Sequence, residues 1–312
     1  MSVYTPVSEA ELAAWLARYA VGRLEACEPI KAGIENTNYF VTTTQGRYVL
    51  TLFERLPAEE LPFYLGLMAH LARHGIPAPA PIADLSDQYL GRLNGKPAAL
   101  VTRLPGGSLE RPGVAECAEL GALLGRMHLA GRSFPGFLEN PRGQKWWRFA
   151  AKEVSPHLKK NQLELLEKEL QFQSEQRFPD LPRGPVHADL FRDNTLFEKG
   201  RISGVIDFYF AGIDCLLYDV AVCANDWCLA GPSIESGRMR ALLAAYQGVR
   251  AFTPLEKEAW PAMLRAAALR FWLSRLHDFH LPRPGMLVHA HDPEHFRKIL
   301  EDRVRAKAPW ID

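Results

Sequence analysis

A chain of 312 residues, 47% of them hydrophobic, can bury a substantial core in one large domain or in two packed lobes. Acidic and basic residues nearly cancel, and the formal net charge is +1 at pH 7. No overall charge would attract nucleic acid or an anionic membrane, so the composition predicts neither as a partner.

The cysteines and the amino terminus bear on the compartment. The five cysteines form no Cys-x-x-Cys pair, and their odd number argues against a disulfide framework. Residues 1–11 carry acids and a proline where a secretion signal needs a basic segment and an apolar run. No stretch approaches the roughly 20 uninterrupted apolar residues that cross a bilayer. We therefore expect a soluble protein of the reducing cytoplasm.

The first third of the sequence predicts a helix followed by an antiparallel sheet. Apolar residues recur at helical spacing over 8–19, with Ser8 and Glu11 forming a capping box. Short apolar or β-branched runs then predict three strands, over 30–33, 37–43 and 47–53. A helix is expected over 61–74, ending at Gly75, and a hairpin around Asn94-Gly95 leads into a strand over 98–102.

A break at 105–107, Pro-Gly-Gly, suggests a boundary between an N-terminal lobe, 1–103, and a C-terminal lobe, 104–312. Beyond the break the pattern is mainly helical, with helices predicted over 114–130, 146–154, 158–176, 239–246 and 254–280. The exception is 186–208, where apolar runs at 195–197 and 202–206 flank a polar turn. This pattern predicts a hairpin set among helices.

Polar residues around that hairpin form the strongest motif. The run HADLFRDN occupies 187–194, and IDF follows the hairpin at 206–208. Phosphoryl transfer needs one carboxylate to accept the proton of the attacking hydroxyl, and oxygen ligands to hold Mg²⁺ against the phosphates of ATP. We predict that Asp189 is this carboxylate, that Asn194 and Asp207 bind the metal, and that His187 orients the loop. The alternative is that these residues only form turns and caps, as we expect for Asp193.

Through these motifs, the sequence resembles the aminoglycoside-phosphotransferase-like kinases and, within them, the homoserine kinases of that fold. The likeness covers nearly the whole chain and rests also on GIENTNYF at 33–40, YVLTL at 48–52, LGRMH at 124–128 and LYDVA at 217–221. The resemblance implies a protein-kinase-like, bilobal α+β fold, with an N-terminal antiparallel sheet lobe that binds nucleotide and a mainly helical C-terminal lobe for catalysis and substrate binding. It also implies ATP and Mg²⁺ as cofactors, L-homoserine as the acceptor, and a product that feeds threonine synthesis.

The segment 33–40 lies where kinases of this fold place a hairpin over ATP. Backbone N–H groups near Gly33 and the side chains of Asn36 and Asn38 are therefore expected to approach the phosphates. An ordinary β-turn is the alternative. The adenine ring is expected against the strand that ends at Thr102.

One position departs from the family pattern. Kinases of this fold usually carry a lysine on the third strand, and this chain has Thr51 there. Lys31 is the candidate for the missing charge, with a solvated surface lysine as the alternative. His128 and Asp219 are expected to be structural, His128 buried on its helix and Asp219 anchoring the catalytic loop.

A zwitterionic acceptor needs a cation for its carboxylate and an acid or carbonyls for its ammonium group. Arg270 and Arg275 are the candidate cations, and Asp226 or Glu35 the candidate acids, with Tyr209 nearby. Salt bridges between helices are the alternative role for the arginines.

Two other functions stay open at this stage. A kinase of the same fold could act on an aminoglycoside or an amino alcohol, and Asp226 and Tyr209 do not discriminate against either. A non-catalytic nucleotide-binding protein is the other alternative, suggested by Thr51. The sequence does not determine the oligomeric state, and a homodimer is one option.

Overall fold

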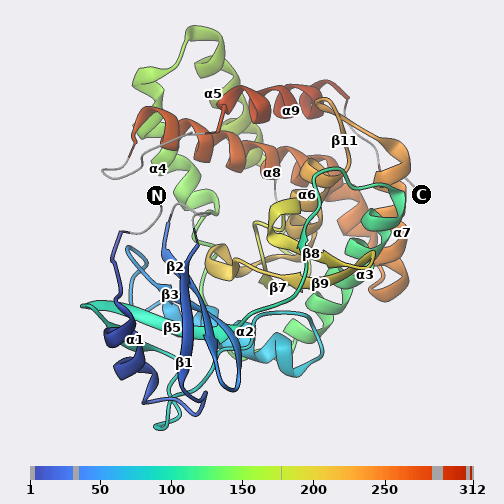
Figure 1. Cartoon of the computed structure of the whole chain (residues 1–312). Helices are drawn as coiled ribbons and strands as arrows, with labels where there is room; N and C mark the ends of the chain where they lie inside the picture. The colour runs from blue at the N-terminus through green and yellow to red at the C-terminus, as the bar shows by residue number, and fades with distance from the viewer. Residues whose placement is uncertain (1–3, 31–34, 177, 283–290, 307–309, 311–312) are drawn as a thin grey trace. The chain divides into compact units, whose positions relative to one another are not determined.

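The computed structural model describes residues 4–30, 35–176, 178–282, 291–306 and 310. These residues fall into two compact units, one ending at Gly106 and the other beginning at Gly107. Figure 1 labels most of the helices and strands of each unit along the chain.

The first unit is an antiparallel sheet with two helices. In chain order it contains α1 (Glu9–Leu16), β1 (Leu24–Pro29), β2 (Thr37–Thr43), β3 (Gly46–Leu52), α2 (Leu61–Arg73), β4 (Gly91–Leu93) and β5 (Lys96–Thr102). The strands lie in the order β1-β2-β3-β5-β4, and every neighbouring pair is antiparallel. Leu12, Trp15 and Leu16 of α1 join Leu50 and Leu100 of the sheet in one buried apolar cluster.

Local signals in this unit behave as predicted. Ser8 caps α1, and its hydroxyl and Glu11 form the expected capping box. Helix α2 ends before Gly75, whose φ of 75° is the left-handed conformation that favours glycine. Asn94 and Gly95 both have positive φ, as a two-residue hairpin turn between β4 and β5 requires. The first helix is shorter than the predicted 8–19, since α1 spans Glu9–Leu16.

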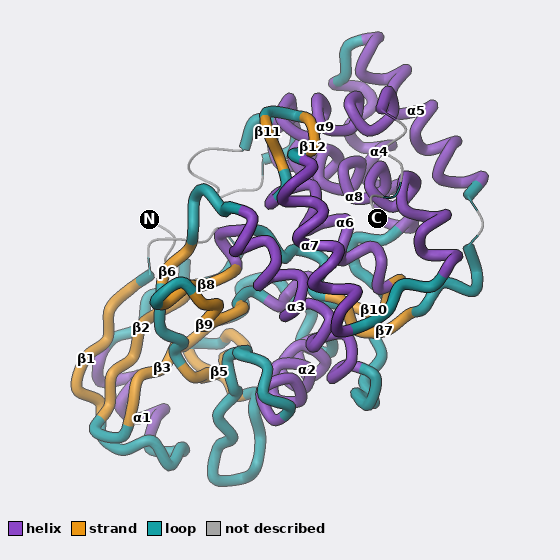
Figure 2. Tube along the Cα trace, turned by 90° about the vertical axis from the view of Figure 1, so that its right-hand side faces the viewer, coloured by secondary structure: helices purple, strands orange, loops and turns teal. Residues whose placement is uncertain are grey.

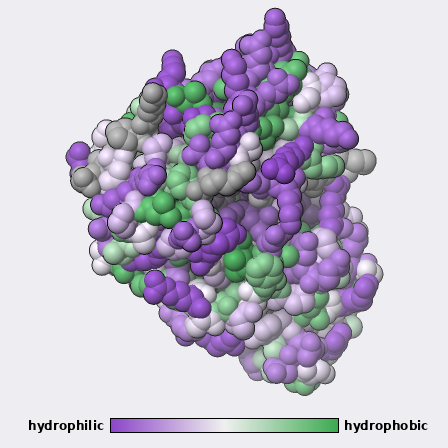
Figure 3. Space-filling model, turned by 180° about the vertical axis from the view of Figure 1, so that it is seen from behind, coloured by the Kyte–Doolittle hydropathy of each residue, from purple (hydrophilic) through white to green (hydrophobic). Residues whose placement is uncertain are grey.

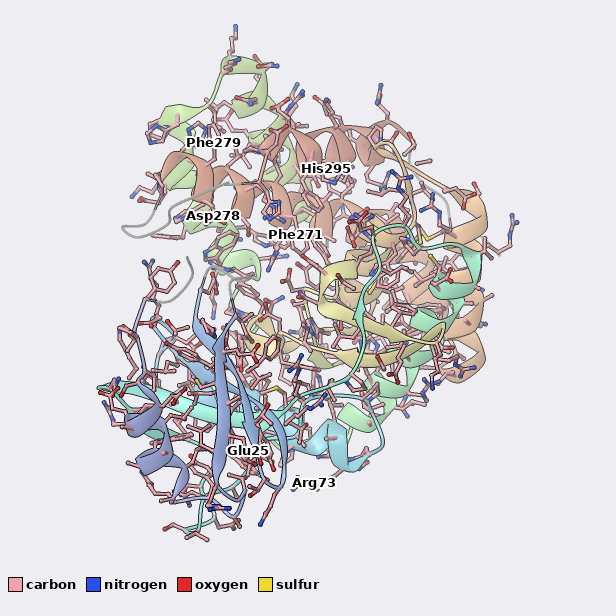
Figure 4. The ribbon with its side chains drawn as sticks, in the orientation of Figure 1. Glu25, Arg73, Phe271, Asp278, Phe279 and His295 are labelled. Atoms are coloured by element: carbon pink, nitrogen blue, oxygen red, sulfur yellow. The ribbon has the colours of Figure 1, made fainter. Side chains whose placement is uncertain are left out.

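The first strand was predicted in the wrong place. The structure has β1 at Leu24–Pro29, whereas the prediction was 30–33, of which 31–33 lie outside the described residues. Strand β1 is at the edge of the sheet and pairs with β2 alone. An edge strand tolerates Pro29 and exposed acids such as Glu25, labelled in Figure 4, so its sequence lacks the usual apolar alternation.

The second unit is mainly helical, as the purple segments of Figure 2 show. Its helices are α3 (Val114–Gly131), α4 (Gln144–Val154), α5 (Lys160–Glu175), α6 (Leu216–Trp227), α7 (Ser236–Val249), α8 (Pro254–His280) and α9 (Pro293–Ala306). Its strands are β6 (Gly107–Ser108), β7 (Arg183–Val186), β8 (Thr195–Glu198), β9 (Arg201–Val205), β10 (Gly212–Cys215), β11 (Leu229–Ala230) and β12 (Ser233–Ile234). β8 and β9 form the predicted hairpin, and β7 pairs with β10.

Helices α6 and α9 were not predicted. Every residue of α6 is buried, so the helix lacks the alternation between an apolar and a polar face by which a surface helix is recognised. Helix α8, in contrast, has the predicted bounds, with Thr253 as N-cap and Pro254 in its first turn.

Helices α3 and α7 pack unusually closely through two glycines. A Cβ atom added to Gly121 would lie 2.2 Å from the carbonyl oxygen of Leu242, and one added to Gly125 would lie 2.9 Å from Cβ of Val249. Real Cβ atoms do not approach neighbours this closely, so the absence of a side chain at both positions permits the contact. His128, one turn beyond Gly125, is thereby brought against α7.

Three further observations bear on the predictions from composition. All five cysteines lie in the described part of the chain, and none is joined in a disulfide. Within the described residues no helix combines the length and the apolar character that spanning a bilayer requires. The face drawn in Figure 3 is covered mainly by hydrophilic residues, with hydrophobic ones between them.

Candidate active site

The catalytic motif predicted from the sequence lies in the loop between β7 and β8. The loop runs from His187 to Phe191, and a short 3-10 helix, Arg192–Asn194, leads into β8. After β9 the chain passes through Ile206 to Asp207, which has a left-handed backbone with φ of 63°. The hairpin β8–β9 therefore returns Asp207 toward the loop that carries Asp189.

The loop is anchored by Asp219 in the first turn of α6. The two carboxylate oxygens of Asp219 accept hydrogen bonds from the backbone N–H groups of His187 and Ala188, each at 2.8 Å. Ala188 has φ of 63°, a conformation that costs an alanine roughly 1–2 kcal/mol. The expectation that Asp219 anchors the loop is confirmed, and the anchor holds the strained residue directly before Asp189.

Asp219 is ionised although it is fully buried. Burial alone would raise the pKa of its carboxyl group, but the hydrogen bond from His128, at 3.3 Å, and the one from the backbone N–H of His187 hold the pKa below its ordinary value. His128 is buried, as predicted, and its other ring nitrogen bonds to the hydroxyl of Tyr246.

His187 connects the loop to the residue before Asp207. Its Nε2 lies 2.9 Å from the carbonyl oxygen of Ile206, and its Nδ1 accepts from the N–H of Asp189 at 3.3 Å. Burial lowers the pKa of His187, against the opposing charge of Asp219, so the ring is neutral with its proton on Nε2. Both ring nitrogens are thus committed to backbone groups.

Asn194 makes the second connection within the motif. Its side-chain amide nitrogen donates to the carbonyl oxygen of Asp189 at 2.8 Å and to Asp189 Oδ2 at 3.3 Å. The backbone carbonyl oxygen of Asn194 accepts from the backbone N–H of Ile206 at 2.9 Å. Asn194 is therefore bonded both to Asp189 and to the residue preceding Asp207. The side chains of Asp189, Asn194 and Asp207 can offer a cation carboxylate and amide oxygens, the ligands that Mg²⁺ prefers.

Two arginines of α8 supply positive charge near Asp189. Arg270 Nη1 lies 3.4 Å from Asp189 Oδ1, and the side chains are 4% and 16% exposed. The guanidinium of Arg270 also packs over the rings of Phe210 and Phe271, while its Nε has no hydrogen-bond partner in the structure as described. Burial lowers the pKa of Arg275, and the charge of Asp189 opposes that shift, so Arg275 also lies within electrostatic reach of the carboxylate.

An aromatic cluster fixes the end of the loop. The ring centroid of Phe191 is 4.3 Å from that of Phe271 on α8 and 5.8 Å from that of Phe296 on α9. Figure 4 labels Phe271 and also His295, the neighbour of Phe296. Stacking of these rings holds the loop against both helices.

Asp226 has a partner within the same unit. Its carboxylate accepts from the backbone N–H, Nε and Nη2 of Arg192 at 2.9 to 3.0 Å. Burial raises the pKa of Asp226, and the charge of Arg192 opposes this. Asp226, one of the two candidates for an ammonium group, thus holds the 3-10 helix that follows the catalytic loop. Tyr209, the other predicted neighbour, follows Asp207 by two residues in the short helix Phe208–Phe210.

The predicted nucleotide residues lie in the first unit. Thr51, which stands in place of the family lysine, is buried and donates its hydroxyl to Asn38 Oδ1 at 2.8 Å. Asn36 is buried, and its Oδ1 has no hydrogen-bond partner in the part of the chain that the structure describes. Thr102 accepts at its hydroxyl from the N–H of Ala80 at 2.9 Å. Glu35 is half-buried, and Lys31 and Gly33 lie outside the described residues.

The catalytic motif lies in a part of the chain that matches a known protein family. A family model described as "Phosphotransferase enzyme family" matches residues 26–252, which span the sheet, the catalytic loop, Asp207 and Asp219. The chain belongs to this family. The expectation of a phosphotransferase is thereby confirmed.

Two curated relatives of this phosphotransferase match it over nearly its whole length. A homoserine kinase of Ralstonia nicotianae is 51% identical over 330 residues, covering 100% of this chain and 98% of its own. A homoserine kinase of Burkholderia thailandensis is 49% identical over 318 residues, covering 97% and 96%. Among solved structures, the amicoumacin kinase hAmiN in complex with AMP-PNP, Ca²⁺ and Ami has a TM-score of 0.72 at 16% identity, covering 97% of this chain and 95% of that one. This likeness confirms the predicted kinase-like fold.

Some contacts of the site have no sequence signal. The motif identified Asp189, Asn194 and Asp207, but nothing in the pattern indicated that Arg192 pairs with Asp226 or that Tyr246 contacts His128. These partners are separated by 34 and 118 residues, beyond the reach of a local pattern.

Proposed function

We propose that this phosphotransferase is a homoserine kinase, which transfers the γ-phosphoryl group of ATP to the side-chain hydroxyl of L-homoserine and forms O-phospho-L-homoserine. The observation that carries the proposal is the identity of 51% and 49%, over essentially the full length, to two proteins of that name. The sequence motifs predict phosphoryl transfer, and the resemblance to the homoserine kinases implies the same acceptor. Such an enzyme serves threonine biosynthesis, and the unpaired cysteines suit the cytoplasm in which we place it.

Asp189 is the proposed base. Its backbone is fixed on one side by Asp219, through Ala188, and on the other by Asn194. A carboxylate held in this way can orient the acceptor hydroxyl and accept its proton as the new O–P bond forms. His187 keeps the loop in register with Ile206 and transfers no proton in the reaction, because both of its ring nitrogens bond to the backbone.

Asn194 and Asp207 are the proposed metal ligands. The amide nitrogen of Asn194 is used by Asp189, which leaves its Oδ1 to face a cation. One amide oxygen and one carboxylate fit Mg²⁺, which keeps several water and phosphate ligands. When bound, the ion would neutralise negative charge on the phosphates of ATP.

Arg275 and Arg270 are proposed to bind the carboxylate of the acceptor. Arg275 is half-buried and near Asp189, so its guanidinium can meet the carboxylate of a substrate whose hydroxyl lies at Asp189. Arg270 has one long contact to Asp189, so further N–H donors remain for the same group. This positive charge favours an amino acid over a polycationic aminoglycoside. Glu35 remains the proposed partner of the ammonium group, since Asp226 is held by Arg192.

For the nucleotide we keep the sequence-based assignment to Gly33, Asn36, Asn38 and Thr102, with Lys31 supplying charge. Asn36 is buried directly before β2, and its side-chain NH₂ group is a donor of the kind that a phosphate oxygen accepts from. The Oδ1 of Asn38 accepts from Thr51, so its NH₂ group is the part of this side chain that we assign to the nucleotide.

The test is a coupled assay of ADP formation with Mg-ATP and a panel of acceptors: L-homoserine, L-serine, choline, ethanolamine and an aminoglycoside. We expect kcat/KM to be highest for L-homoserine, with the product identified as its phosphate ester by mass spectrometry. An equal or higher kcat/KM for an amino alcohol or an aminoglycoside would overturn the proposal. Phosphorylation of no acceptor, together with tight binding of ATP, would instead favour a non-catalytic nucleotide-binding protein.

A further inference from the structure

A buried chain of hydrogen bonds leads from Asp219 to the corner between α7 and α8. His128 Nδ1 lies 2.7 Å from the hydroxyl of Tyr246, and Arg250 Nη1 lies 3.1 Å from the same oxygen. Arg250 Nη1 also lies 2.9 Å from Glu256 Oε1. The residues of this chain are at most 5% exposed, so water cannot replace the bonds between them.

The groups at the two ends of this chain fix the direction of its outer bonds. A guanidinium only donates, so the oxygen of Tyr246 accepts from Arg250. An ionised carboxylate only accepts, so Nε2 of His128 carries a proton that faces Asp219. Between these bonds, the hydroxyl of Tyr246 and Nδ1 of His128 share one hydrogen bond at 2.7 Å. Burial raises the pKa of Tyr246, so its hydroxyl keeps its proton. A continuous series of hydrogen bonds therefore joins Arg250 to the buried carboxylate, and such bonds polarise one another.

The corner itself is held at both helix ends. Arg250 is the C-cap of α7, and its ion pair with Glu256 is buried. Glu256 is the third residue of α8 and accepts from the backbone N–H of Thr253, the N-cap, at 2.8 Å. The ring of Tyr246 stacks on Phe252 at 4.7 Å. The position of the Tyr246 hydroxyl is thus fixed by packing that does not depend on the catalytic loop.

We propose that Tyr246 is a positioning residue for the phosphotransfer reaction. Acting through His128 and Asp219, its hydroxyl holds Ala188 in the left-handed conformation and thereby aims Asp189. The inference rests on the proposed function in one respect, because it takes Asp189 as the base. Removal of the hydroxyl rotates or weakens the donor that faces Asp219 and leaves the aromatic packing intact.

The variant that isolates the hydroxyl is Tyr246→Phe. Tyr64→Phe is its matched control: Tyr64 is equally buried, at 0% exposure, and donates one hydrogen bond to a carboxylate, that of Glu60 at 3.0 Å. Tyr246→Phe removes the hydrogen bonds to His128 and from Arg250, of which the one to His128 leads toward Asp219. Loss of that bond corresponds to a fall of about three- to tenfold in kcat if the bond acts on the transition state. We expect this fall for Tyr246→Phe, with the KM values for ATP and L-homoserine within about twofold of wild type. Tyr64→Phe should lower Tm, because it also loses a hydrogen bond, and should leave kcat unchanged.

Two further measurements separate positioning from a general loss of stability. In the Asp219→Asn background, Tyr246→Phe should have no additional effect on kcat, because the path between them is already broken. Hydrogen exchange of the peptide covering 187–194 should be faster in Tyr246→Phe than in wild type or Tyr64→Phe, a result that needs no assay of activity.

Wild-type kcat in Tyr246→Phe, an equal loss in Tyr64→Phe, an undiminished effect in the Asp219→Asn background, or unchanged exchange of the loop would each overturn the inference. Absence of wild-type activity toward L-homoserine would instead count against the proposed function. The exchange measurement then still decides whether Tyr246 holds the loop.

Discussion

Replacing Asp219 by asparagine tests how the catalytic loop is held. The carboxylate accepts two backbone hydrogen bonds at 2.8 Å and one from His128 at 3.3 Å, all of them buried. An asparagine has one acceptor oxygen, so its NH₂ group would face the N–H of His187 or Ala188 and leave a buried donor without a partner. That donor costs about 1–3 kcal/mol, and the remaining bonds lose the strength that the charge gives them. We expect the free energy of unfolding to fall by about 3–4 kcal/mol in total.

The same change should lower kcat by about a hundredfold, because a catalytic group misplaced by about 1 Å costs a factor of this order. Urea denaturation followed by circular dichroism measures the stability, and the coupled kinase assay measures kcat. Asp84→Asn is the control outside the catalytic loop. Asp84 Oδ1 accepts two backbone hydrogen bonds, from Ser86 at 2.9 Å and Gln88 at 3.0 Å, and its Oδ2 pairs with Arg18, an ion pair that the asparagine would lose. This control should lose stability and keep kcat.

The pH dependence gives a second readout for Asp219→Asn. Because the folded-state pKa of Asp219 is held below its ordinary value, its contribution to stability is complete above the unfolded-state pKa of about 4. The contribution is lost as the pH falls through the lower, folded-state pKa. The difference in stability between wild type and Asp219→Asn should therefore narrow below about pH 4. Unfolding free energies within about 1 kcal/mol of each other at pH 7, or an equal loss of kcat in Asp84→Asn, would refute this account of the loop.

Three other predictions concern single side chains. Asp189→Asn should lower kcat by a factor of about 10³ or more with little change in the KM for ATP, measured by steady-state kinetics, since the proton acceptor is lost and the nucleotide residues are not touched. Ala188→Val should lower the free energy of unfolding by about 2–4 kcal/mol in denaturant titration, because a buried, β-branched residue at positive φ is both strained and overpacked; an unchanged midpoint would contradict the strained conformation. Gly121→Ala should cost about 1–3 kcal/mol, because the new methyl group meets the backbone of Leu242 at 2.2 Å, and a Tm equal to wild type would show that α3 and α7 can separate freely.

The sequence by itself determined the features that depend on neighbouring residues. The capping box at Ser8, the Asn94-Gly95 turn, the N-terminus of α8 and the hairpin β8–β9 were predicted from local chemistry and were found. The catalytic motif was visible for the same reason, because Asp189, Asn194 and Asp207 lie within one loop and the hairpin that follows it.

Only the tertiary structure decided how that motif is supported. Asp226, one of two candidates for the ammonium group of the substrate, pairs with Arg192, a contact that the sequence did not indicate. The first strand, β1, lies at the edge of the sheet and not at its predicted residues. The bonds that join Tyr246, His128 and Asp219 cross three helices. Spacing along a chain limits what adjacent residues can do, whereas contacts between distant segments depend on which helices can approach, and here that depends on the missing side chains of Gly121 and Gly125.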